Sequence, residues 1–264
     1  MSSPSFRFKQ FTVWHDRCAM KVGTDGVLLV AWCPLPISRS EAPSNTQGVL
    51  YPRILDIGTG SGLIALMIAQ RLHSRGDIPA ILGIDIDCDA VEQSQINFQQ
   101  SPWANSLTSQ KCRLQDMPTE QAFDLIVSNP PYFQDSLKNP NAQRATARHT
   151  DTLSYAELIA HSARLLQEDG ILALVLPIEA EQEILTLAAN HGLHPTHITY
   201  VHSKPGKPAK RLLIALSPIS NNQYPITNSE ASNTQYPITD TMYIESENAP
   251  RSDEYKELTK DFYL

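Results

Sequence analysis

Hydrophobic and polar positions follow two different periods along the middle of the chain. Short apolar runs of strand length are followed by longer segments in which apolar residues recur every three or four positions. The runs that predict strands lie at 53–58, 80–87, 112–116, 123–129, 170–177, 196–203 and 210–217. The segments that predict helices lie at 63–72, 89–100, 155–166 and 179–192. This alternation predicts an α/β fold with a mostly parallel, twisted, seven-stranded sheet and helices on both faces.

The segments outside this core have different patterns. Residues 6–13 alternate large apolar with polar side chains, which predicts a strand or hairpin arm, and Thr24 and Asp25 are good N-cap residues for a following helix. Residues 218–240 are polar and favour a surface insertion. We therefore expect an N-terminal extension packed on the core, the core itself, the insertion, and a C-terminal strand with a tail. These parts span residues 1–52, 53–217, 218–240 and 241–264.

The composition is that of a globular protein, with 41% hydrophobic and 19% charged residues. The chain has no run of about 18 apolar residues, so no membrane span is expected. Its first residues lack an apolar signal core, which favours a cytoplasmic location. The four cysteines form no C-x-x-C pair, so we expect reduced thiols and no metal site. We expect a monomer.

The net charge of −7 is unevenly distributed. From Glu230 onward the chain has eight acidic and three basic side chains, whereas residues 204–211, KPGKPAKR, hold four bases and no acid. Residues 1–24 are also basic. A partner feels the charge within about 10 Å more strongly than the total, so a nucleic-acid partner is compatible with this composition.

A glycine-rich loop joins the first predicted strand of the core to its helix. It contains Gly58, Gly60 and Gly62. Such a loop lets a ligand approach the backbone closely, but its spacing differs from the dinucleotide fingerprint G-x-G-x-x-G. Asp56 precedes the loop and suits a ligand with an ammonium group. Asp85, or alternatively Asp87, can accept the hydroxyls of a ribose. A nucleoside with a cationic tail fits S-adenosylmethionine; a ligand-free turn and an NAD domain are the alternatives.

A second motif, Asn129-Pro130-Pro131-Tyr132, follows the strand at 123–129. Ligands of open parallel sheets bind beyond the carboxyl ends of the strands. The prolines stiffen the turn, so that the Asn129 amide oxygen and the Pro130 carbonyl can hold both hydrogens of an NH₂ group. Such a grip turns the nitrogen lone pair towards an electrophile, and Tyr132 offers a face for a stacked base. The alternative is an ordinary turn after a strand.

These motifs resemble those of class I methyltransferases that act on amino nitrogens. The resemblance covers residues 53 to about 217 and implies a Rossmann-like fold that binds S-adenosylmethionine. It implies that LDIGTGSG, Asp85 and Asp116 contact the cofactor, with Asp116 near its adenine amine. It also implies that N-P-P-Y is the catalytic motif.

The N-terminal segment narrows this resemblance. CAMKVGTDG (18–26), with RATARHT (144–150) and the ending LTKDFYL, resembles the tRNA1(Val) adenine-N6 methyltransferases. That family modifies the adenine just 3′ of the anticodon, adenine 37, in one valine tRNA. The match implies that four residues lie near the methionine end of the cofactor. They are Lys21, Gly23, Thr24 and Asp25.

Substrate contacts are expected from bases and from the N-P-P-Y turn. The candidates are Pro131, Phe133, Arg144, Arg148, Lys204, Lys207 and Lys210. The basic side chains could bind phosphates, or could simply form a solvated face. His15 and His149 could accept a proton, although the mechanism needs no tuned base.

Other functions fit part of this pattern. A methyltransferase of a protein glutamine, as on release factors, also presents NH₂ to such a turn but usually carries a helical domain first. Methylation of rRNA or DNA adenines is a second alternative. An NAD-linked oxidoreductase should show G-x-G-x-x-G and no N-P-P-Y. A non-catalytic cofactor-binding protein would differ by the outcome of Asn129→Ala.

Overall fold

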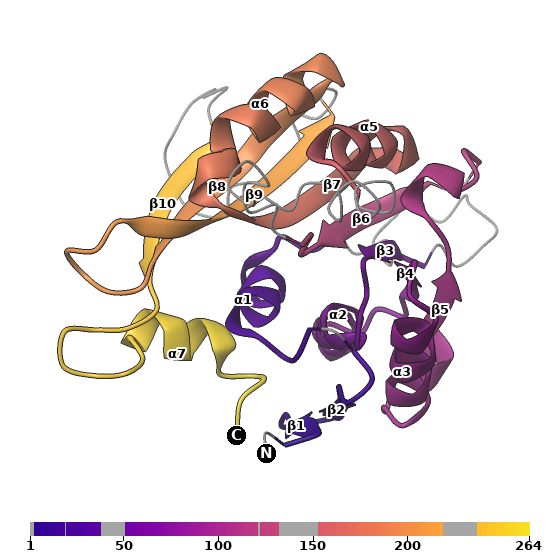
Figure 1. Cartoon of the computed structure of the whole chain (residues 1–264), viewed down its shortest axis with the longest axis horizontal. Coiled ribbons are helices and arrows are strands. Elements are labelled where there is room, and N and C mark those ends of the chain that lie inside the picture. The colour runs from indigo at the N-terminus through magenta and orange to yellow at the C-terminus, as the bar shows by residue number, and fades with distance from the viewer. Residues whose placement is uncertain (1–2, 19, 38–50, 121, 132–152, 219–236) are drawn as a thin grey trace, which may run out of the picture.

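The computed structural model describes residues 3–18, 20–37, 51–120, 122–131, 153–218 and 237–264. In these ranges, one eight-stranded sheet has the order β10-β8-β9-β7-β6-β3-β4-β5 (Figure 1). Its strands are β3 (Arg53–Ile57), β4 (Ala80–Asp85), β5 (Leu107–Lys111), β6 (Phe123–Ser128), β7 (Leu166–Pro177), β8 (Leu193–His202), β9 (Ala209–Pro218) and β10 (Ile238–Tyr243). A separate antiparallel hairpin is formed by β1 (Ser5–Arg7) and β2 (Thr12–Trp14), as the alternation over 6–13 predicts.

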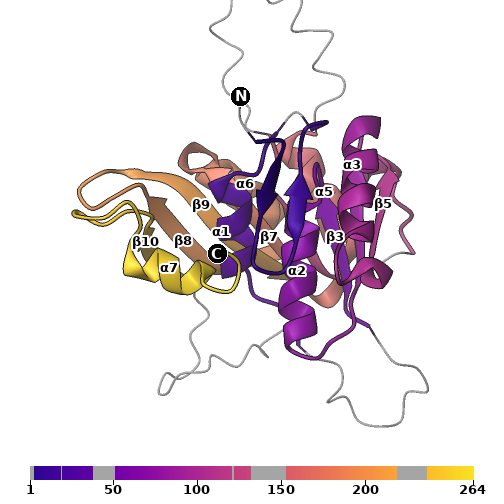
Figure 2. The ribbon, with the colours of Figure 1, turned by 90° about the horizontal axis from the view of Figure 1, so that it is seen from below.

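Helices cover both faces of the sheet. One face carries α1 (Thr24–Trp32), α2 (Leu63–Ser74), α3 (Cys88–Gln99) and α7 (Asp253–Thr259), and Figure 2 looks onto these helices. The other face carries α5 (Tyr155–Leu165) and α6 (Glu181–Asn190). Each face has its own hydrophobic cluster, so the sheet is buried on both sides. This burial explains why the central strands are continuously apolar rather than alternating.

The sheet is mostly parallel, as predicted, but has one strand more than expected. β9 runs antiparallel to its neighbours β7 and β8, while the remaining pairs are parallel. The additional strand is β10, which pairs with β8. Thr199 of β8 donates a hydrogen bond to Asp240 of β10 and accepts one of 2.7 Å from Trp32 of α1. The strand predicted after the polar segment therefore extends the main sheet.

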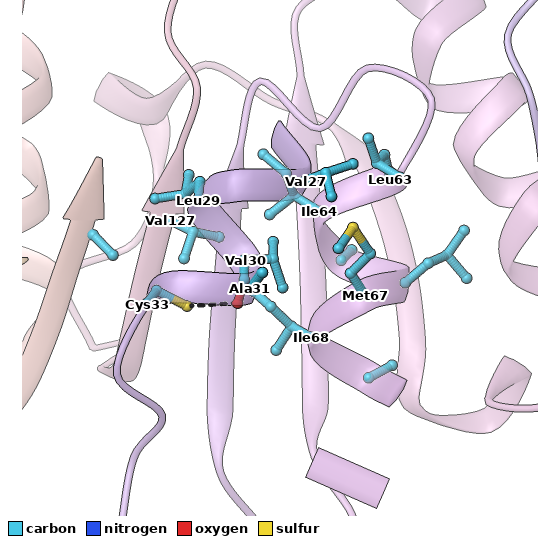
Figure 3. Packing of buried hydrophobic residues seen from close by; sticks show 14 of the residues in the cluster. Val27, Leu29, Val30, Ala31, Cys33, Leu63, Ile64, Met67, Ile68 and Val127 are labelled. Carbon is cyan, nitrogen blue, oxygen red and sulfur yellow. Dashed lines mark hydrogen bonds between the residues drawn. The ribbon is translucent and has the colours of Figure 1, made fainter. Parts of the chain in front are cut away.

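α1 is the element that joins the N-terminal segment to the core. All its residues from Gly26 to Ala31 are buried, and a Cβ added at Gly26 would lie 3.4 Å from Leu63 of α2. Figure 3 shows Leu29 facing Val127 of β6 and Val27 beside Ile64 of α2. α1 has only nine residues.

Among the described residues, no helix combines the length and apolarity needed to cross a bilayer.

Two local predictions were wrong. Residues 112–116 do not form a strand: β5 ends at Lys111, and Leu114–Asp116 form a short 3-10 helix. β5 lies at the sheet edge and buries little apolar surface, so its apolar period is weak. Thr24 and Asp25 do not cap α1, because both already belong to the helix and Gly23 holds the extended N-cap position.

Candidate active site

The site lies where two neighbouring strands of the sheet end. Ile57 at the end of β3 pairs with Ser128 at the end of β6, and the Ser128 hydroxyl donates a 2.9 Å hydrogen bond to the Ile57 carbonyl. The chain leaves β3 towards β4 on one side, and leaves β6 towards β7 on the other. Such a switch point in strand order opens a crevice at the carboxyl ends of the strands. The glycine loop and Asn129 therefore start side by side, although 71 residues separate Ile57 from Ser128 in sequence.

The three loop glycines all have positive φ, but the space around them differs. A Cβ at Gly58 would meet no atom within 4 Å, and one at Gly60 would lie 3.9 Å from the Gly58 carbonyl oxygen. At Gly62 a Cβ would lie 2.4 Å from the Phe98 ring. The last glycine is thus required for packing against α3, whereas the first two leave open space at the strand end. This space allows a ligand to approach the backbone.

Asp56 is fully buried directly below the glycine loop. One carboxylate oxygen accepts a 2.8 Å hydrogen bond from the Thr59 hydroxyl, and the other, Oδ1, has no partner among the described residues. Burial raises the pKa of Asp56 to about 7, although the hydrogen bond from Thr59 and the nearby backbone N–H of Ala65 oppose this shift. A buried acid with an unpartnered oxygen can be stabilised by a cationic ligand group, which fits the predicted ammonium contact.

Asp85 and Asp87 are distinguished by their hydrogen bonds. The Asp85 carboxylate accepts backbone N–H groups from Gly60 and Asp87, each at 3.0 Å. Asp87 is the N-cap of α3 and accepts the N–H of Asp89 at 2.9 Å. Asp85 therefore ties the glycine loop to the end of β4, and each of its oxygens has a second lone pair for a ribose hydroxyl. Asp87 stabilises the helix, so the geometry favours Asp85 as the ribose acceptor.

Asn129 follows β6 with its amide oxygen turned away from solvent. Oδ1 is shielded and has no hydrogen-bond partner among the described residues. Pro130 is buried and Pro131 is exposed. An unpaired shielded carbonyl costs about 1–3 kcal/mol relative to a paired one, so a donor from a ligand would relieve this penalty. The Asn129 amide oxygen is therefore suited to accept a hydrogen bond from an N–H group of a ligand.

The segment before α1 lies at the same edge of the sheet. Asp25 accepts a 2.9 Å hydrogen bond from Arg211 of β9, and Arg211 pairs in register with Pro177 at the carboxyl end of β7. Gly23 and Thr24 directly precede this ion pair, and Lys21 is exposed. The first turn of α1 is therefore fixed at the carboxyl edge. Contact of Lys21, Gly23, Thr24 and Asp25 with the cofactor stays a prediction.

Two side chains of α3 that sequence reasoning missed hold the N-terminal segment: Asn97 connects the hairpin to the glycine loop, and Gln93 binds the residues after the hairpin. The Asn97 amide donates to the Trp14 and Ser61 carbonyls at 2.8 Å and accepts the Trp14 N–H at 3.0 Å. Gln93 accepts the backbone N–H of Arg17 at 3.4 Å. Both are buried and one helical turn apart. Amides at i and i+4 among the inward positions of an amphipathic helix were the available signal.

The remaining predicted contacts are placed as follows. Asp116 is exposed, and the chain that leads to it starts beside Asp85, whose carbonyl accepts the Cys112 N–H at 3.0 Å. Lys204, Lys207 and Lys210 are exposed around the turn between β8 and β9, next to the strand end that holds Arg211. These lysines and Asp116 thus share the carboxyl edge with the glycine loop.

His15 and several predicted residues lie outside this group. His15 is buried with Nε2 3.1 Å from the Ser3 carbonyl oxygen, which favours a packing role over proton transfer. Some predictions lie outside the described residues: Tyr132, Phe133, Arg144, Arg148 and His149.

Comparison with known proteins gives a consistent result. Residues 44–190 match the model of the methyltransferase small domain family. The chain is 43% identical over 264 residues to a tRNA1(Val) (adenine(37)-N6)-methyltransferase of Phocaeicola vulgatus, covering 100% of this chain and 99% of the relative. It is 44% identical over 266 residues to the protein of the same name from Parabacteroides distasonis, with the same coverage.

Among solved structures, the chain resembles "a predicted O-methyltransferase, protein Atu636 from Agrobacterium tumefaciens". The TM-score is 0.59 at 15% sequence identity, and the match covers 90% of this chain and 96% of the other. This likeness concerns the fold.

Proposed function

Because the chain belongs to the family of tRNA1(Val) (adenine(37)-N6)-methyltransferases, we propose that it methylates the exocyclic N6 of adenine 37 in tRNA1(Val). The enzyme is an S-adenosylmethionine-dependent methyltransferase, and the cofactor supplies an electrophilic methyl group. The observation that carries the choice of an amine acceptor is the shielded, unpartnered Oδ1 of Asn129 beside the glycine loop.

The residues at the two strand ends suit the two halves of the reaction. The open space at Gly58 and Gly60 suits the cofactor, Asp56 its ammonium group, and Asp85 its ribose. On this proposal Lys21, Gly23, Thr24 and Asp25 close over the methionine end, and Asp116 contacts the adenine amine.

Asn129 and the Pro130 carbonyl hold the N–H groups of the target base. An adenine amino nitrogen is a weak nucleophile because its lone pair is delocalised into the ring. Two acceptors that bind both hydrogens favour a pyramidal nitrogen whose lone pair points at the methyl group, and they stabilise the positive charge that develops. The acceptors thus supply positioning and electrostatic stabilisation, and no strong base is needed before transfer.

The RNA contacts follow from this placement. The target adenine must leave its stack or lie in a loop, and the anticodon loop satisfies this need. We assign Tyr132 and Phe133 to base stacking beside Pro131, and the basic residues to phosphates. Those residues are Arg144, Arg148, Lys204, Lys207 and Lys210.

A direct experiment tests the proposal. The protein is incubated with S-adenosylmethionine and total tRNA, and N6-methyladenosine is mapped by mass spectrometry of purified, digested species. We expect methyl incorporation at position 37 of tRNA1(Val), and none in a transcript that carries guanine there. Methylation of a release factor without any methylation of RNA would overturn the assignment.

A further inference from the structure

A cavity of about 660 Å³ lies between the first residues of the chain and its C-terminal helix. The hairpin contacts the C-terminal segment directly, because the Lys9 N–H donates to the Phe262 carbonyl at 2.9 Å. Figure 2 shows α7 beside α1 on this face of the sheet. Four basic side chains from the two ends of the sequence line the cavity: Lys9, Arg251, Lys256 and Lys260.

The C-terminal segment is acidic overall, but the charged side chains that line the cavity are basic. Lys256 and Lys260 are one helical turn apart and both line the cavity, whereas no Asp or Glu side chain of the described residues does. Their ion-pair partners, Asp253 and Glu257, lie on the helix beside them with side chains 100% and 72% exposed. Exposed ion pairs of this kind are weak, so both lysines can still bind another anion.

The other walls of the cavity are aromatic. Tyr255 and Tyr263 line it together with Phe6, and the Arg251 guanidinium lies over the Tyr255 ring at 4.9 Å from its centroid. Cations combined with aromatic faces suit a chain of phosphates that carries planar groups. Tyr255 itself is buried and packs against Tyr263, so the aromatic faces open to a ligand are those of Phe6 and Tyr263.

The cavity also borders the segment before α1 that is predicted to lie near the cofactor. Gly23 and Thr24 form part of its lining, and the next residue, Asp25, pairs with Arg211 at the carboxyl edge of the sheet. We propose that this cavity binds backbone phosphates of the RNA substrate, through Lys9, Arg251, Lys256 and Lys260. This inference rests on the proposed function, since it adds a docking surface for the RNA whose adenine enters that site.

Two double variants test the role of the charge. Lys256→Gln with Lys260→Gln, and Asp253→Asn with Glu257→Gln, break the same two ion pairs but shift the charge of α7 in opposite directions. The affinity for an unmodified tRNA1(Val) transcript is measured by fluorescence anisotropy at several salt concentrations with S-adenosylhomocysteine present. The KM for this tRNA is measured alongside.

The lysine variant should bind the transcript roughly tenfold more weakly, and the slope of log K against log salt should fall by about 1.5. Its KM should rise in proportion, with kcat and S-adenosylhomocysteine affinity unchanged. The acid variant should bind as well as the unmodified protein or better. Equal losses in both variants would mean that α7 acts only through its stability, and would overturn the proposal.

A third variant, Lys9→Gln, tests the opposite wall and should weaken binding about threefold. The outcomes separate the two proposals. If the wild-type protein methylates tRNA, but the lysine variants have the same affinity for the transcript and the same salt slope as the wild type, only the cavity assignment fails. If the unmodified protein methylates no tRNA, the proposed function itself fails.

Discussion

The two polar side chains at the candidate site, Asp85 and Asn129, differ in how far the protein satisfies them. Both Asp85 oxygens accept backbone N–H groups, which fixes the carboxylate and the glycine loop to each other. The Asn129 oxygen is shielded and accepts nothing from the described residues. On the proposed function, the cofactor side is thus organised by the chain itself, and the acceptor side is completed by the substrate. A substitution at Asp85 should therefore disturb binding, and one at Asn129 should disturb only transfer.

The sharpest test of this comparison is Asn129→Ala. We expect kcat to fall about 10²- to 10³-fold, because an acceptor for the developing charge is removed, while S-adenosylhomocysteine affinity stays unchanged. Single-turnover methylation of tRNA and calorimetric titration measure the two quantities. Asn190→Ala, at the exposed end of α6, is the matched control and should change neither. Full activity of Asn129→Ala would refute the role given to this amide.

Asp85→Ala tests the other side of the comparison. The variant should lose about 10²-fold in S-adenosylhomocysteine affinity, because it removes the ribose acceptor and leaves the Gly60 N–H without its partner. Asp87→Ala is the control: loss of an N-cap should cost about 1 kcal/mol of unfolding free energy with little effect on affinity. If the two variants lost affinity equally, the distinction between these acids would be wrong.

Asn97→Ala tests whether the cofactor side of the candidate site depends on the N-terminal hairpin. The variant loses the hydrogen bonds that join Trp14 to Ser61 of the glycine loop, so Asn97 is expected to be a positioning residue. We expect S-adenosylhomocysteine affinity and the cofactor KM to worsen about tenfold with kcat little changed. Ser94→Ala removes a buried polar group whose hydrogen bond stays within α3, and should leave both values unchanged. A fall in kcat alone would contradict this role.

The smallest effect concerns the pH dependence of cofactor binding through Asp56. Burial raises the pKa of this group from the usual 3.8 to about 7. At a pH between these two values, Asp56 is protonated in the folded protein without cofactor and ionised in the unfolded chain. Stability should therefore fall as pH rises from about 4 to about 7. Affinity for the ammonium group should rise about twofold between pH 7 and pH 8, because the charged carboxylate binds it.

Calorimetric titration and denaturant unfolding at several pH values measure both trends. Asp56→Asn has no titrating group at this position and should show neither. If the variant kept the same pH dependence of affinity, another group would be responsible.

Much of the core was predictable because its signals are local. The apolar runs located most strands within a few residues, and the three loop glycines followed from spacing alone. Prediction was weakest where local signals were faint. β5 at the sheet edge buries little, so its apolar period could not be separated from the residues that follow it. The Asn97 bridge was missed because its partners are backbone groups 36 and 83 residues away.

The sequence by itself determined the parallel α/β order and the position of the glycine loop, because these depend on periodicity and on backbone preferences of single residues. Only the tertiary structure decided which groups meet. The order of strands made the ends of β3 and β6 neighbours, and packing of the two chain ends gathered Lys9 with the bases of an acidic segment. Such contacts depend on long-range pairing, for which the residues involved carry no local signal.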